Sequence, residues 1–251
     1  MDIGIGALLF GAGLAGGVAN AMAGGATLIT FPAMIASGLL PIVANASNAV
    51  AVTPGHFVAA LSDRAQLPRL DQALVGGLAA TVVGGAIGAI LLLVTPERLF
   101  TLLVPALIGI ATLVFALGHR IHAADAQSHS ARSDLLRWAL LVPTSIYGGY
   151  FGGGSGVMYL AVLVITGRET IRQANVLKNL LASVVSAVTI IIFVVQGIVS
   201  WPETIVMLVG AVVGGFLGGR LVTVLAPTTV RVVVISAGAL MTLVYAWRYW
   251  V

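Results

Sequence analysis

The fold is decided by the stretch Asn175-Val176-Leu177-Lys178-Asn179 and by the glycine break before it, Gly152-Gly153-Gly154-Ser155. Lys178 is the only lysine of the protein and lies in an otherwise apolar segment. On a helix Asn175, Lys178 and Asn179 share one face, because they are spaced i, i+3 and i+4. A cation and two amides are costly to keep in a membrane helix, and they need a partner. No carboxylate follows in this segment, so the pattern favours an anion that binds and leaves.

The composition predicts an integral membrane protein built from helices. Of 251 residues, 59% are hydrophobic and only 8% are charged, and the mean hydropathy is +1.10. A soluble domain of this size is about 25% charged. The apolar runs are long and do not alternate, which excludes a transmembrane barrel. The net charge of +4, without a basic and aromatic cluster, excludes nucleic acid as a partner, and the absence of cysteine excludes thiolate chemistry.

The chain divides into two similar halves joined by a polar linker. We expect a first transmembrane repeat over 1–117, a polar cytoplasmic linker over 118–134 and a second repeat over 135–251. Each half opens with a glycine break, a short apolar segment and a helix that begins with amides. A helix with a Gly-x-x-x-Gly spacing, which allows close packing, and a proline turn follow in each half. Corresponding motifs of the two halves lie about 130 residues apart. The ten apolar segments fall at roughly 3–22, 26–37, 43–62, 73–94, 98–117, 135–150, 156–166, 171–197, 203–225 and 229–247.

Positive charge predicts how the repeats are oriented. If the opening pair of segments in each half is a re-entrant hairpin, each half has three full spans and the halves are inverted. The linker side then holds nine arginines and the outer side holds Arg98 and Arg248. If the pair makes one net crossing, the arginines divide six to five, which carries no signal. We therefore expect inverted repeats with both termini outside, and a hydropathy count of seven to eight spans.

The glycine breaks predict an anion site. A helix that begins at the bilayer midplane directs backbone N–H groups and a partial positive charge into a cavity. Ser155 is placed as the N-cap of the segment after the second break, and Ser186 continues the face of Lys178. We expect the substrate-binding residues to be Gly24, Gly25, Thr27, Asn45, Asn48, His56, Gly153, Gly154, Ser155, Asn175, Lys178 and Asn179.

Other roles remain open for these polar residues. Lys178 can snorkel toward the membrane surface, His56 can bond a neighbouring backbone group, and Asn45 and Asn48 can bond between helices or cap. The acidic residues all fall at segment ends or loops, and the linker histidines have no fixed spacing. We therefore expect no metal, no cofactor and no catalytic constellation.

The same residues resemble the sulfite exporter TauE/SafE family of membrane permeases. The likeness covers nearly the whole chain outside the linker. It rests on Gly24-Gly25 followed by Pro32, Gly38 and Asn45–Asn48, and on Gly152–Gly156 followed by Gly167, Ala174-Asn175 and Lys178-Asn179. The resemblance implies a multi-pass protein of the bacterial inner membrane that moves sulfite or an organosulfonate, with the lipid bilayer as its surroundings.

The leading expectation is a secondary transporter that exports a small sulfur-containing anion by alternating access, with coupling to protons possible. The alternatives are a passive anion channel, a carrier of a small organic carboxylate, and a subunit that binds an anion without moving it. The substrate, direction, coupling ion and oligomeric state are left open by the residues.

Overall fold

The computed structural model describes residues 2–22, 25–62, 67, 71–123, 134–166, 170–221 and 227–251. All regular secondary structure in these ranges is helical, and each predicted apolar segment corresponds to one helix. The helices are α1 (Ile3–Met22), α2 (Thr27–Ala36), α3 (Pro41–Ser62), α4 (Gln72–Val94), α5 (Glu97–Ala123), α6 (Asp134–Tyr150), α7 (Ser155–Thr166), α8 (Ile171–Val195), α9 (Trp201–Leu221) and α10 (Pro227–Trp250).

One boundary differs from the expectation. The helix α5 continues through 118–123, where the sequence predicts the start of the polar linker. The remainder of that linker, 124–133, lies outside the described residues, and α6 begins at Asp134.

Six of the described helices are long and apolar enough to cross a membrane: α1, α4, α5, α8, α9 and α10. This is fewer than the seven to eight spans expected from hydropathy. The 22-residue helix α3 is long enough but is missing from the six, because Asn45, Asn48 and His56 lower its hydropathy. The helices α2 and α7 have 10 and 12 residues, and are too short to cross a core of about 30 Å.

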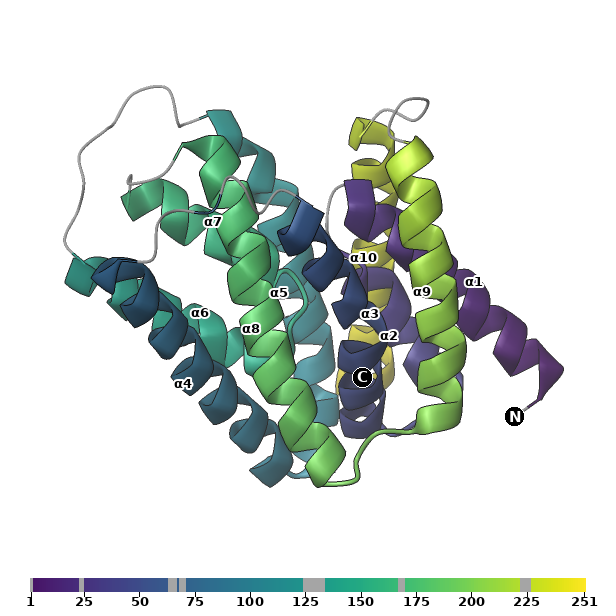
Figure 1. The fold of residues 1–251 in the computed structure, drawn as a ribbon. Helices are drawn as coiled ribbons and strands as arrows, with labels where there is room; N and C mark the ends of the chain where they lie inside the picture. The colour runs from purple at the N-terminus through teal and green to yellow at the C-terminus, as the bar shows by residue number, and fades with distance from the viewer. Residues whose placement is uncertain are drawn as a thin grey trace.

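Glycines hold two pairs of helices in close contact, at opposite sides of the bundle (Figure 1). Gly214 of α9 packs on the backbone of Leu14 in α1, and Gly88 of α4 packs on the backbone of Ile146 in α6. A Cβ at either glycine would meet backbone, which moves only at a high cost. The predicted packing role of the Gly84–Gly88 and Gly214–Gly218 spacings is confirmed. Residue numbers rise together along both contacts, so each pair is parallel.

The contacts between the two halves come in matching pairs: exchanging the halves turns one contact of a pair into the other. The first helix of each half packs on the fourth helix of the other half, as α1 on α9 and α6 on α4. The third helix of each half packs likewise on the other half's fourth, as α3 on α9 and α8 on α4. The helices α3 and α8 also pack on each other, as do α5 and α10. The two halves are therefore intertwined through most of their contacts and do not stand as separate bundles.

The helices α5 and α10 run antiparallel. Arg231, near the start of α10, donates to the carbonyl oxygen of Ala116 at 2.6 Å, near the end of α5. At the opposite ends, Trp250 Nε1 donates to the carbonyl oxygen of Leu102 at 2.9 Å. Large apolar side chains remain exposed along α4, α9 and α10, such as Val75, Phe216 and Leu243. These surfaces suit contact with lipid.

Candidate functional site

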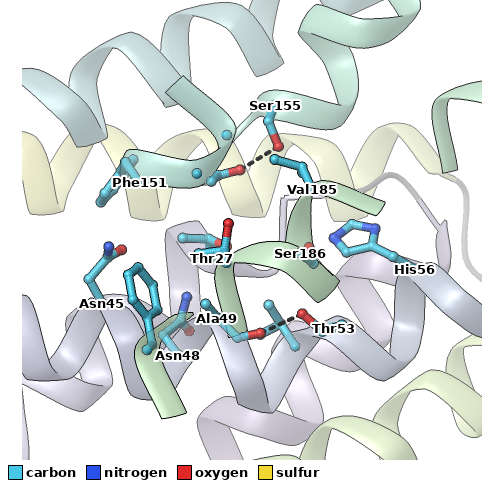
Figure 2. A pocket seen from close by; sticks show the side chains of 16 residues that line it. Thr27, Asn45, Asn48, Ala49, Thr53, His56, Phe151, Ser155, Val185 and Ser186 are labelled. Carbon is cyan, nitrogen blue, oxygen red and sulfur yellow. Dashed lines mark hydrogen bonds between the residues drawn. The ribbon is translucent and has the colours of Figure 1, made fainter. Parts of the chain in front are cut away.

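A cavity of about 30 Å³ lies at the centre of the bundle, between α3, α8 and the two helix breaks. A volume of this size holds about two water molecules. Figure 2 shows Asn45 and Asn48 at one end of the lining group and His56 beside Ser186 at the other. The lining residues are Thr27, Asn45, Asn48, Ala49, Val52, Thr53, His56, Gly148, Gly149, Phe151, Gly152, Ser155, Val185, Ser186, Thr189 and Phe193.

Glycine forms the breaks that bring two helix starts to this cavity. Gly25 before α2, and Gly152 and Gly154 before α7, have φ of +95°, +81° and +76°, which disfavours any residue with a Cβ. A Cβ built on Gly153 would lie 3.3 Å from Thr27 Cγ2, so the second break touches the start of α2. The first residues of both short helices, Thr27 and Ser155, line the cavity.

Ser155 differs from its expected role as an N-cap. It is the first helical residue of α7, and its hydroxyl donates to the carbonyl oxygen of Gly152 at 2.8 Å. An N-cap side chain would instead accept from a backbone N–H of the first turn. The tight glycine turn brings the Gly152 carbonyl next to the hydroxyl, so the Ser155 side chain satisfies that carbonyl and does not cap the first turn.

Three buried polar side chains on the cavity carry an oxygen without a hydrogen-bond partner in the described part of the chain. They are Asn45, Asn48 and Thr189, whose side chains are 2%, 1% and 3% exposed. The orientation of the Asn45 amide is fixed, because its Nδ2 donates to the carbonyl oxygen of Tyr150 at 3.0 Å. Its Oδ1 is therefore left as an acceptor. Leaving a buried acceptor unpaired costs about 1–3 kcal/mol, so these oxygens point to a molecule that binds there.

The polar residues Asn175, Lys178 and Asn179, which form a stripe along α8, lie next to the cavity and do not line it. Lys178 Nζ donates to Asn175 Oδ1 at 2.9 Å, and the backbone oxygen of Asn179 accepts from the Ser183 hydroxyl at 2.7 Å. His56, which lines the cavity, is near enough to Lys178 for an electrostatic interaction. Lys178 is about 10 Å along the helix axis from Val185, where the α8 side of the cavity begins.

The direction of the helices explains this separation. Near the start of α3, the Ser47 hydroxyl accepts from the backbone N–H of Ser200, just beyond the end of α8, at 2.9 Å. The helices α3 and α8, which pack on each other, are therefore antiparallel, so the end of α3, with His56, lies toward the start of α8, with Lys178. Each helix carries its amides near its own start, so the two stripes lie at opposite ends of the pair.

The structure thus brings together five of the expected residues: Thr27, Asn45, Asn48, His56 and Ser155. Gly25, Gly153 and Gly154 shape the breaks beside the cavity, and Gly24 lies outside the described residues. Asn175, Lys178 and Asn179 stand apart, as described above.

Sequence reasoning missed Thr53 and Thr189 in the lining. A signal for Thr189 exists, because it follows Ser186 by three residues on the same helical face. Thr53 gives a similar signal, because it lies on the same helical face as Asn45, Asn48 and His56; in the structure its hydroxyl bonds the Ala49 carbonyl of its own helix at 2.6 Å.

Comparison with known proteins identifies the family. The family model for the sulfite exporter TauE/SafE matches residues 9–245. This chain belongs to that family. The probable membrane transporter protein YfcA of Escherichia coli strain K12 is 30% identical over 241 residues, which are 94% of this chain and 87% of the relative. A probable membrane transporter protein of Haemophilus influenzae is 28% identical, over 96% of this chain and 95% of the relative. No solved structure matches the chain.

Membership of the TauE/SafE family places the site in a membrane transporter. The protein is a multi-pass membrane transporter of the bacterial inner membrane, with six described helices suited to crossing it. A cavity lined by buried polar groups and enclosed by broken helices is the kind of place where transporters bind their substrate.

Proposed function

We propose that this TauE/SafE family protein is a secondary transporter that exports a small sulfur-containing oxyanion through the central cavity by alternating access. The observation that carries the proposal is the set of unpaired oxygens on Asn45, Asn48 and Thr189, all on one cavity between two broken helices. Polar groups of this kind inside a membrane bundle mark a substrate pathway. The family's description as a sulfite exporter supports both the chemical class and the direction.

The electrostatics of the cavity favour an anion. The starts of α2 and α7 reach it through Thr27 and Ser155, and helix starts carry partial positive charge. His56 lines the cavity, and Lys178 interacts with His56 from the neighbouring helix. Among the described residues that line the cavity, none is acidic. An anion therefore meets attraction there and no opposing carboxylate.

The unpaired amide oxygen narrows the class of substrate further. Asn45 Oδ1 can only accept a hydrogen bond, since the amide is held by the Tyr150 carbonyl. An oxyanion without a proton presents only lone pairs to such a group. We therefore favour an anion that also carries a hydrogen-bond donor, such as hydrogen sulfite or an amino-sulfonate.

We also propose that the two halves are inverted repeats, with the linker in the cytoplasm. Two observations support this arrangement. The corresponding helices α5 and α10 are antiparallel, so exchanging the halves reverses their direction. The starts of α1 and α3 both lie at the start of α9, through the parallel α1–α9 contact and the Ser47–Ser200 bond. The pair α1–α2 thus enters and leaves on one side, as a re-entrant hairpin does.

Ligand-dependent thermal stability of the purified protein tests the proposed substrate class. Sulfite, sulfate, taurine, sulfoacetate and acetate are compared across pH, with sodium chloride of the same ionic strength as the control. A ligand at 100 times its Kd stabilises the folded state by about 2.7 kcal/mol, which raises the melting temperature. We expect sulfite to stabilise more at a pH where it carries a proton. A shift with small carboxylates alone would discard the sulfur assignment.

A further inference from the structure

The symmetry of the chain singles out a second set of polar residues that the cavity does not use. Asn45 is the fifth residue of α3, and Asn175 is the fifth residue of α8; Asn48 and Lys178 are both eighth. Shifting the six α3 residues of the cavity lining by 130 positions gives Asn175, Lys178, Asn179, Ala182, Ser183 and Ser186. Of these, only Ser186 lines the cavity now.

The two sets have matching chemistry. The α3 set combines two amides with the Thr53 hydroxyl and His56, and the α8 set combines two amides with two hydroxyls and Lys178. Both follow the same helical face, at positions 0, 3, 4, 7, 8 and 11. Each set thus offers neutral hydrogen-bonding groups and one nitrogen base, and each suits a small oxyanion.

The two sets follow one another along the α3–α8 pair. On α8, Ala182 lies on the face between Lys178 and Ser186, so one side of the helix leads from the second set into the cavity. His56 belongs to the α3 set and interacts with Lys178 of the α8 set. In this structure two members of the second set are bonded to each other, because Lys178 Nζ donates to Asn175 Oδ1 at 2.9 Å.

We propose that Asn175, Lys178 and Asn179 form a second binding site for the same small oxyanion, used when the transporter opens to the opposite side. This inference rests on the proposed function. If the two intertwined halves exchanged their conformations, the cavity beside Asn45 and Asn48 would close. A matching cavity would then open beside the start of α8. The bound anion would then replace Asn175 as the partner of Lys178. The substrate thereby passes from one end of the α3–α8 pair to the other.

Single cysteines test this second site, and the chain itself contains none. Ala49→Cys reports on the first set and Ala182→Cys on the second, and both variants keep every amide and Lys178. Each is exposed to a membrane-impermeant thiol reagent in right-side-out and in inverted vesicles, with and without taurine, an amino-sulfonate that does not react with thiols. Gln196→Cys is the control, because Gln196 is an exposed polar residue at the end of α8 that does not line the cavity.

We expect Ala49→Cys to be modified from one side of the membrane and Ala182→Cys from the other, with both slowed at least tenfold by taurine. The control should not respond to the ligand. Modification of Ala182→Cys from the same side as Ala49→Cys, or from neither side while Ala49→Cys is protected, would overturn the second site alone. If Ala49→Cys is not protected, the proposed substrate class fails instead.

Discussion

Asn48→Leu strongly lowers the affinity for substrate and leaves the protein as stable as the wild type, or more stable. The Asn48 side chain is 1% exposed, lines the cavity, and has a buried oxygen without a partner. Leucine has the same branching at Cγ, its larger volume can extend into the cavity, and it removes that unpaired acceptor, so we expect folding to lose little. The substrate, which carries the charge, loses its hydrogen bond to the Asn48 amide, worth about 1.5–3 kcal/mol. An apolar side chain also replaces part of the polar wall of the cavity.

The expected effect is a fall in substrate affinity of about 10- to 100-fold or more, since 1.4 kcal/mol is a factor of ten. Melting temperature and substrate flux are measured on the same preparation. Thr81→Val is the matched control: Thr81 is fully buried in α4, but its hydroxyl bonds the Gly77 carbonyl at 2.9 Å, away from the cavity. Normal flux in Asn48→Leu would remove Asn48 from the site.

Gly154→Ala is the second change with a large expected effect. Gly154 has φ of +76°, and a Cβ there would lie 3.3 Å from the backbone oxygen of Ala111 in α5. A non-glycine residue held in this conformation costs about 1–3 kcal/mol, and the crowding adds to that cost. The break can relieve the strain only by moving the start of α7, which carries Ser155 to the cavity. We therefore expect a lower melting temperature together with loss of flux.

Gly156→Ala provides the comparison for Gly154→Ala. Gly156 lies two residues further on, within α7, and a Cβ there meets nothing within 4 Å. Alanine is also the better helix former, so this variant should keep wild-type stability and flux. Equal behaviour of the two variants would contradict the role given to the glycine break.

The helices and the breaks could be predicted from the sequence because both depend on local chemistry. Runs of apolar residues about 20 long require helices in lipid, and glycine at Gly152 and Gly154 allows a backbone conformation that other residues avoid. The close packing at Gly88 and Gly214 follows from the same kind of local pattern. The extension of α5 to Ala123 was not predictable, because polar residues continue a helix as readily as they form a linker.

The composition of the site was only partly predictable, since it depends on which helix ends meet. The sequence places Asn45 and Asn48 on one helical face and Lys178 with its asparagines on another. The expected inversion of the repeats implies that α3 and α8 run antiparallel, but the sequence does not say that these two helices pack on each other, an arrangement that separates the two faces. The same geometry brings in Thr189, and gives Asn45 an unexpected partner in the Tyr150 carbonyl.

Counterflow of labelled sulfite in liposomes that contain only this protein tests the central claim most directly. Vesicles are loaded with unlabelled sulfite and diluted into labelled sulfite, and the uptake of label is followed over time. A carrier that binds sulfite in the central cavity gives a transient overshoot of label that saturates with concentration and is absent with Asn48→Leu. Uptake without overshoot that rises linearly with concentration, and is equal in the variant, would contradict a binding cavity with alternating access.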